Sequence, residues 1–118
     1  MQSAAILKNG TVRGEIKLKR YYAEYVRHCL RFYVMTLDVG SCPKFNTEVD
    51  KNNWMACHLS VKNIDPKTLE VIKEIYRPGD TIPDKVYHLA KEHRVSQDSI
   101  WNIINTLERN VAKKRGLL

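Results

Sequence analysis

Residues that interrupt helices are scarce in this sequence: its 118 residues include only four prolines and five glycines. Several long stretches contain neither residue, which favours helices over a sheet of short strands. The apolar runs are only a few residues long, and no secretory leader is visible, so a membrane-spanning helix and secretion are not expected. The sequence therefore predicts a cytoplasmic, all-α protein that does not enter a membrane.

Cysteine is scarce as well. Cys29, Cys42 and Cys57 form an odd set without paired spacing, which predicts neither a disulfide framework nor a structural zinc site. His28-Cys29 and Cys57-His58 are the only adjacent pairs of metal-ligand residue types. A phosphate-binding glycine loop and a nucleophile motif are also missing. We therefore expect no metal, no cofactor and no catalytic activity.

Positive charge is present in excess, with 20 Lys and Arg against 13 Asp and Glu and a formal net charge of +7. Residues 1–48 hold eight basic and four acidic side chains, and residues 66–118 hold ten and seven. Such an excess concentrates a protein near polyanions, so nucleic acid is a candidate partner. Because the excess is split between the two ends, charge does not decide which end contacts the polyanion.

The first strong apolar period lies in residues 17–37 and predicts a long amphipathic helix that ends near Gly40 and Pro43. Phe32 lies off the apolar stripe. The stripe recurs at three- and four-residue steps and comprises Tyr22, Tyr25, Val26, Cys29, Leu30, Tyr33 and Val34. Packing onto the C-terminal helices is the simplest role for this face. A dimer or polymerase-binding face and a nucleic-acid stacking surface are the alternatives.

Three parts of the chain are expected: a flexible tail over 1–14, the amphipathic helix and a linker over 15–48, and a helical domain over 49–118. In that domain Asp50 is the expected N-cap of a first helix. Its inward face holds Trp54, Cys57, His58 and Val61.

Three further helices have clear start and stop signals. Asp65, Thr81 and Ser96 are their expected N-caps, the segment 77–80 separates the first two, and Gly116 ends the last. Their expected inward positions are Leu69, Ile72, Ile75, Tyr76, Val86, Leu89, Ala90, Ile100, Ile103, Ile104, Leu107 and Val111. The fold class is thus all-α, with four to five helices and a long helix at the N-terminal side.

Residues 85–107 fit a helix-turn-helix pattern at most positions. Ala90 is the small residue where two helices approach, and Val95 is expected to point from the turn into the core. Ile100 and Ile103 are spaced to pack on the preceding helix. Arg94 stands where the turn often has glycine, and a left-handed conformation there costs roughly 1–2 kcal/mol. Any helical hairpin with a short loop would show similar spacing.

Residues 66–118 resemble region four of bacterial sigma factors and related small phage or mobile-element transcription regulators of Gram-positive bacteria. LEVIKEIY resembles the helix that opens that region, and VYHLAKEHRVSQDSIWNIINTLERNVAKKRGL resembles the following helix pair with its basic end. The resemblance implies binding to double-stranded DNA and action beside RNA polymerase. It covers a little under half of the chain, and the preceding residues are too few for a complete sigma factor.

A recognition helix starting near Gln97 would place its first exposed side chains in the major groove. Gln and Asn can pair with adenine through two hydrogen bonds. The candidate base-reading residues are Gln97, Asp98, Trp101, Asn102 and Asn105. Asp98 could read cytosine, but it could equally serve the helix dipole. Trp101 could face DNA or pack on the N-terminal helix.

Basic residues around this helix are candidates for phosphate contacts, which would make binding steeply dependent on salt. They are Lys85, Lys91, Arg94, Arg109, Lys113, Lys114 and Arg115. The run 113–115 could instead be a solvated helix end that complements the dipole. These residues predict a DNA-binding transcription regulator, with RNA polymerase and a second copy of the chain as further candidate partners. The alternative is a protein-interaction module that uses the same helices to dock a polymerase or to dimerise.

Overall fold

Five α-helices make up the fold in a computed structural model that describes residues 13–40 and 43–118. They are α1 (Arg13–Val39), α2 (Glu48–Val61), α3 (Pro66–Tyr76), α4 (Ile82–His93) and α5 (Gln97–Lys114). No strand occurs within these ranges, so the all-α prediction is confirmed. Of the expected tail, residues 1–12 lie outside the described residues, as does Cys42, whereas residues 13 and 14 belong to α1.

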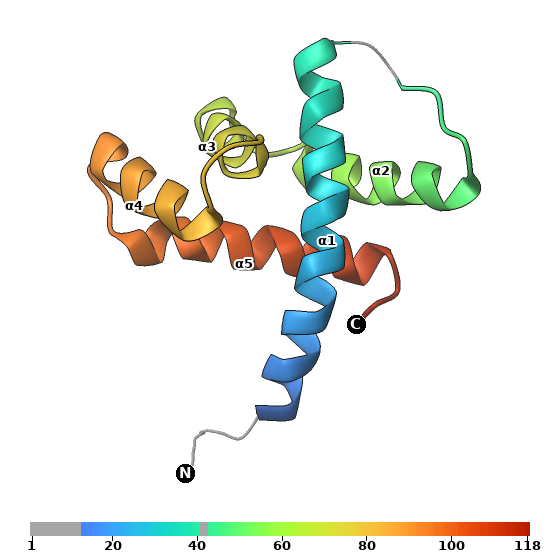
Figure 1. The fold of residues 1–118 in the computed structure, drawn as a ribbon, viewed down its shortest axis with the longest axis horizontal. Helices are drawn as coiled ribbons and strands as arrows, with labels where there is room; N and C mark the ends of the chain where they lie inside the picture. Colours follow the sequence, from blue (N-terminus) through green and yellow to red (C-terminus); the bar gives the residue numbers. More distant parts are fainter. Residues whose placement is uncertain (1–12, 41–42) are drawn as a thin grey trace.

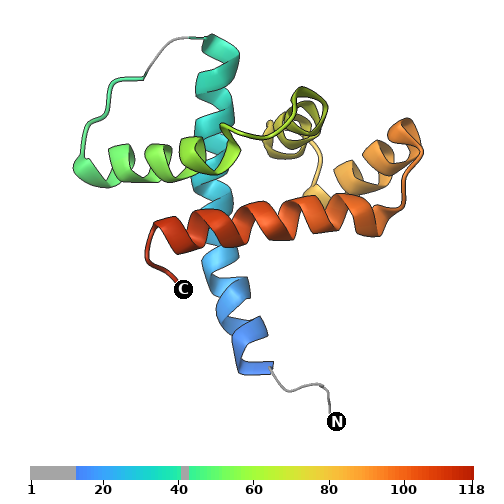
Figure 2. The same ribbon diagram turned by 180° about the vertical axis from the view of Figure 1, so that it is seen from behind.

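The long helix α1 crosses α5. It begins on one side of α5 and ends on the side where α2 and α3 lie (Figure 1). Seen from behind, α2 and α5 both run across α1, while α3 and α4 lie toward the N-terminal half of α5 (Figure 2). Helix α1 contacts α2, α3 and α5, and α4 contacts α3 and α5. The first turns of α1 therefore extend beyond the other helices.

One hydrophobic core holds residues from all five helices. From α1, the residues Val26, Cys29, Leu30, Tyr33 and Val34 are at most 2% exposed, so most of the predicted stripe faces this core. Tyr25 is 39% exposed, and Phe32 is exposed as expected from its position off the stripe. The expected inward residues of α3, α4 and α5 are also buried or pack against the same core, with Leu69 and Ile103 only partly covered.

Helix α2 is held against α1 by an aromatic cluster. The Trp54 ring stacks on His58 with centroids 4.9 Å apart and lies 5.3 Å from the Tyr33 ring. Its indole Nε1–H donates to the Thr36 hydroxyl at 2.9 Å, and the Tyr33 hydroxyl lies 3.0 Å from His58 Nδ1. With Cys57 and Val61 buried beside them, the predicted inward face of this helix is confirmed.

Three of the four predicted N-caps are confirmed. The side chains of Asp65, Thr81 and Ser96 each accept a hydrogen bond from the backbone N–H three residues on, at 3.0, 3.3 and 3.1 Å. The prediction for α2 is wrong, because its N-cap is Thr47 and not Asp50. The Thr47 hydroxyl accepts from the Asp50 N–H at 3.1 Å, so the helix starts about one turn earlier and Asp50 lies in its first turn.

The C-terminal end of α5 has the hydrogen bonds of a Schellman motif. Gly116 has a φ of 72°, and its N–H donates to the Lys113 carbonyl at 3.0 Å. The Leu117 N–H donates to the Ala112 carbonyl at 2.8 Å, and Leu117 packs against the core. Gly116 therefore ends this helix as predicted.

Candidate nucleic-acid interface

The turn between α4 and α5 consists of residues 94–96. Arg94 has φ 57° and ψ 45°, the left-handed conformation expected at the position where this turn often has glycine. The Val95 N–H donates to the Ala90 carbonyl at 3.0 Å, and the Arg94 N–H to the Lys91 carbonyl at 3.3 Å. Ala90 is 5% exposed. These bonds end α4 and turn the chain sharply, so that Ser96 can cap α5.

Val95 does not point into the core. Its side chain is 44% exposed, so the expectation from the helix-turn-helix pattern is wrong at this position. Ala90 before the turn and Ile100 after it are both buried. Ala90 and Ile100 supply the apolar side chains that are buried near the turn, and the three-residue turn itself leaves Val95 at the surface.

The outer face of α5 is polar along its whole length. Asp98, Asn102, Asn105 and Arg109 follow steps of four, three and four residues, and all are exposed. Such steps bring side chains to one side of a helix. Gln97, in the first turn, is exposed as well. Four of the five candidate base-reading residues are therefore accessible to a ligand.

The fifth candidate, Trp101, is half-buried and packs against the core. Its ring thus contributes to the shared core, whereas the expected packing on the N-terminal helix itself stays a prediction. Asp98 lies in the first turn of α5, directly after the Ser96 cap, where a carboxylate complements the helix dipole.

Two of the seven basic candidates are occupied inside the protein. The Lys85 ammonium donates to the Ile75 carbonyl at 3.3 Å and to the Arg77 carbonyl, which covers the end of α3, and desolvation lowers the pKa of Lys85. Arg115 Nε donates to Asn53 Oδ1 at 2.5 Å and so ties the end of α5 to α2. Both side chains are half-buried, which leaves them less available to a phosphate than exposed ones.

The other five basic candidates are exposed, and they fall into two groups. Lys91 lies in the last turn of α4 and Arg94 begins the α4–α5 turn, so both are close in sequence to the exposed start of α5. The Lys91 ammonium lies 5.1 Å from the centre of the Tyr87 ring. Arg109, Lys113 and Lys114 lie on the C-terminal half of α5, the half that α1 crosses (Figure 1). Exposed cations therefore flank both ends of the polar face.

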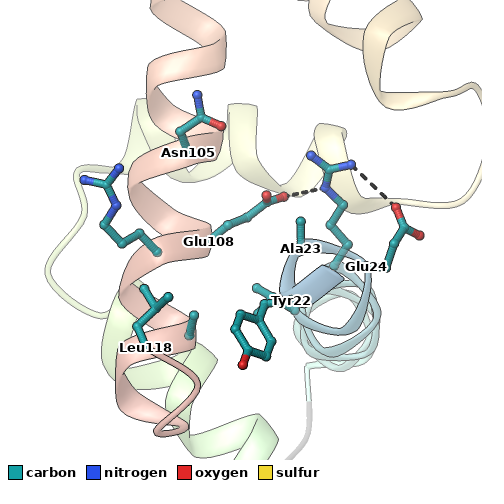
Figure 3. Close-up of a pocket in the computed structure, with 10 residues that line it drawn as sticks. Tyr22, Ala23, Glu24, Asn105, Glu108 and Leu118 are labelled. Carbon is teal, nitrogen blue, oxygen red and sulfur yellow. Dashed lines mark hydrogen bonds and ion pairs between the residues drawn. The ribbon is translucent and has the colours of Figure 1, made fainter. Parts of the chain in front are cut away.

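A cavity of about 370 Å³ lies between α1 and α5 (Figure 3). Asn105 and Arg109 of the predicted site line it, together with residues of the two helices and the segment that follows α5. The complete lining is Tyr22, Ala23, Glu24, Val26, Arg27, Asn105, Glu108, Arg109, Ala112 and Leu118. The polar face of α5 is therefore exposed near the α4–α5 turn, and it forms one wall of the cavity where α1 meets it.

The polar centre beside this cavity is Glu108, which is 7% exposed. Its Oε2 accepts from Arg27 Nε at 2.8 Å and from the Tyr76 hydroxyl at 2.7 Å, which joins α1, α3 and α5. Burial, and after it the charge of Glu108, raises the pKa of Tyr76 well above its ordinary value. A buried carboxylate needs such partners because desolvation otherwise disfavours its charge.

Sequence reasoning missed Glu108, Arg27 and Asn53. Glu108 is one of two charged or polar residues of the described part of the chain that are buried, the other being Asn53. The available signal was position, because Glu108 lies among the inward positions Ile104, Leu107 and Val111 of α5. A lone charged residue in such a stripe indicates a buried partner, but the sequence does not say which residue it is.

Among the described residues, no group of three or more His, Cys, Asp and Glu side chains is arranged to hold a metal ion. None of the described helices combines the length and the apolar character needed to cross a membrane. No family model, curated protein or solved structure matches this chain.

Proposed function

We propose that this protein is a cytoplasmic DNA-binding transcription regulator that places the N-terminal half of α5 in the major groove. The observation that carries the proposal is the α4–α5 unit. Its left-handed turn at Arg94 presents the exposed Gln97, Asp98 and Asn102 at the start of α5. In helix-turn-helix proteins, the N-terminal residues of the second helix contact the base edges.

Charge and chemistry support the same surface. Gln97 and Asn102 offer the amide groups that pair with adenine, and the helix N-terminus favours a phosphate nearby. Five exposed cations flank the polar face: Lys91, Arg94, Arg109, Lys113 and Lys114. If all five neutralise phosphates, the slope of log affinity against log salt would be about −4.5.

The test is fluorescence anisotropy with a labelled pool of random duplexes, over a series of salt concentrations. Arg94→Gln should weaken binding to every duplex and reduce the salt slope by about 1. Lys67→Gln is the matched control, because it removes the same charge from an exposed position on α3. Absence of binding at low salt, or equal loss in both variants, would contradict the proposal.

Base reading requires a second measurement. Duplexes selected from the random pool should bind wild type more tightly than the pool itself. Asn102→Ala should lose about 1–3 kcal/mol of that preference and keep its affinity for the unselected pool. If the selection yields no preferred sequence, only nonspecific binding remains, and this result would contradict the proposal that α5 contacts base edges.

A protein-interaction module is the second candidate, and one observation favours it. Phe32, Met35 and Val39 follow steps of three and four residues on α1 and are 39%, 52% and 75% exposed. Exposed apolar faces of this kind can mark sites where another protein binds. RNA polymerase and a second copy of the chain are the partners to test, by light scattering of the protein alone and after addition of polymerase. If the molar mass measured for the Phe32→Ser and Met35→Ser variants equals that of wild type under both conditions, this face of α1 does not mediate assembly.

A further inference from the structure

We infer that the cavity between α1 and α5 is a binding site for a small amphipathic anion, with a flat apolar body and one carboxylate. The volume of about 370 Å³ is within the range of small-molecule sites, roughly 300–1,000 Å³. Such sites combine mostly apolar walls with a few polar groups that fix the orientation of the ligand.

The apolar walls of this cavity come from small and aliphatic side chains. Ala23 and Val26 lie on α1, Ala112 lies on α5, and Leu118 follows the turn at Gly116. Figure 3 shows Ala23 and Leu118 on opposite sides of the hollow. Two alanines on facing helices leave space that longer side chains would fill, and a flat hydrocarbon ring system fits such a space.

Of the two guanidinium groups that line the cavity, that of Arg27 is already paired with carboxylates. The carboxylate of Glu108 is already paired with Arg27 Nε and the Tyr76 hydroxyl. The same guanidinium forms a second, longer ion pair with Glu24, whose Oε1 lies 3.9 Å from Nη1, so the two carboxylates already compensate the charge of Arg27. Figure 3 shows Glu24 on the far side of this guanidinium from Glu108.

The guanidinium that remains available to an anion at this cavity is that of Arg109. Arg109 lines the cavity, is exposed, and has no ion-pair or hydrogen-bond partner among the described side chains. Glu24 is the one unburied acid of the lining, and its side chain is 76% exposed, so water screens it. Arg109 is therefore the guanidinium of the lining that no carboxylate of the described residues pairs with, and guanidinium groups bind carboxylates through paired hydrogen bonds.

The amide of Asn105 completes the polar side of the site. It lines the cavity from α5, one helical turn before Arg109, and Figure 3 shows it above Glu108. An amide can donate to the same carboxylate or accept from a ligand N–H or O–H. Ligand binding would join α1 to α5 and thereby stabilise the folded chain.

The experiment uses the full chain without DNA and three probes that share a naphthalene ring and carry an anionic, a neutral or a cationic substituent. They are 2-naphthoate, its neutral alcohol 2-naphthylmethanol, and the cation 2-naphthylmethylammonium, each titrated by calorimetry. We expect one saturable site, at least tenfold tighter for naphthoate than for the alcohol, and no saturation with the cation. No saturation by naphthoate at millimolar concentration, or equal affinity for the alcohol, would overturn the inference.

Three variants locate the site. Arg109→Gln should weaken naphthoate at least tenfold and leave the alcohol unchanged, while Lys113→Gln, one turn further along α5 and outside the lining, should change neither by more than twofold. Ala23→Leu fills the hollow and should weaken both probes while far-UV circular dichroism stays that of wild type. Equal effects of Arg109→Gln and Lys113→Gln would overturn the inference.

These measurements are independent of the proposed function. If naphthoate binds but no duplex does, only the DNA-binding proposal fails; if duplexes bind but naphthoate does not, only the ligand site fails. If both bind, naphthoate should displace DNA, because Asn105 and Arg109 belong to the face of α5 proposed to contact it.

Discussion

At the scale of single residues, Arg94 has the most unusual conformation among the described residues other than glycine, because it alone of them has a positive φ. The spacing from Ala90 was enough to predict this conformation, since the turn geometry fixes where the left-handed residue falls. The cost of that conformation for a residue with a β-carbon gives a direct test.

Arg94→Gly should stabilise the protein by about 1 kcal/mol relative to Arg94→Ala, because only glycine adopts the left-handed conformation without strain. Urea denaturation measures the difference. Both variants remove the same charge, so they should lose the same DNA affinity. A glycine variant no more stable than the alanine variant would contradict the conformation of this turn.

The buried carboxylate of Glu108 gives a second residue-scale prediction. Glu108→Gln should cost about 2 kcal/mol of unfolding free energy, because it leaves the half-buried Arg27 without the buried and closer of its two charged partners. Glu24→Gln is the matched control. Its carboxylate lies 3.9 Å from the same guanidinium but is exposed, so the loss should be below about 0.5 kcal/mol. Similar losses in the two variants would contradict a dominant role for the buried pair.

Sequence reasoning had unequal success with individual residues, for a physical reason. Caps and turn residues such as Ser96 and Arg94 act on backbone groups a few positions away, so local sequence predicts them. The exposure of Val95 and the pairing of Glu108 with Arg27 depend on where distant helices pass. A single sequence does not state how helices that are distant along the chain are placed in space.

At the scale of helices, the error at α2 came from two acceptable caps within one turn. Thr47 and Asp50 both belong to residue types that cap helices, and only the backbone distinguishes them: Thr47 is extended, with φ −140° and ψ 162°.

Thr47→Ala should therefore cost about 1 kcal/mol of unfolding free energy, because it removes the acceptor of the Asp50 N–H. Asp50→Asn should cost only a few tenths of the unfolding free energy lost by Thr47→Ala, because it removes only the interaction of the carboxylate with the dipole of α2. Urea titrations of the two variants compare them directly, and a larger loss for Asp50→Asn would move the start of the helix back to Asp50.

The cap of α3 makes stability depend on pH. The backbone N–H of Thr68, and then its side chain, lower the pKa of Asp65 in the folded protein from the ordinary 3.8. Below pH 3.8 the unfolded chain binds a proton that the folded chain still excludes, so stability is present above that pH and falls as pH drops through the lowered pKa.

Asp65→Ser keeps an N-cap acceptor but removes the titrating group. The urea midpoint of wild type should therefore drop more between pH 5.5 and pH 3 than that of Asp65→Ser. Asp38, whose pKa is lowered by its hydrogen bond from Arg77, is present in both proteins and cancels in the comparison. Equal drops would show that the Asp65 carboxylate contributes no pH dependence.

At the scale of the whole molecule, the crossing of α1 over α5 was beyond sequence reasoning. The stripe on α1 predicted a buried face, but an amphipathic period does not name the helix that covers it. Because all five helices share one core, we expect them to unfold as one unit.

Leu30→Ala in α1 should cost about 2–5 kcal/mol, because its side chain is fully buried. In a Trp54→Phe background, the fluorescence of Trp101 on α5 and the circular dichroism of all helices should shift together. If the Trp101 transition stayed in place, α1 would be an appendage to an independent C-terminal unit.

The position of α1 also limits the number of base pairs that α5 could contact in the proposed complex with DNA. Residues 97–104 of α5 precede the first α5 residue that lines the cavity with α1, and they span about 12 Å. That length is about the width of a major groove and covers about four base pairs. A sequence of about four base pairs occurs many times in any genome, so one copy of the protein alone could not specify a single binding site. The remaining information would come from a second copy or from the polymerase beside which the protein is proposed to act.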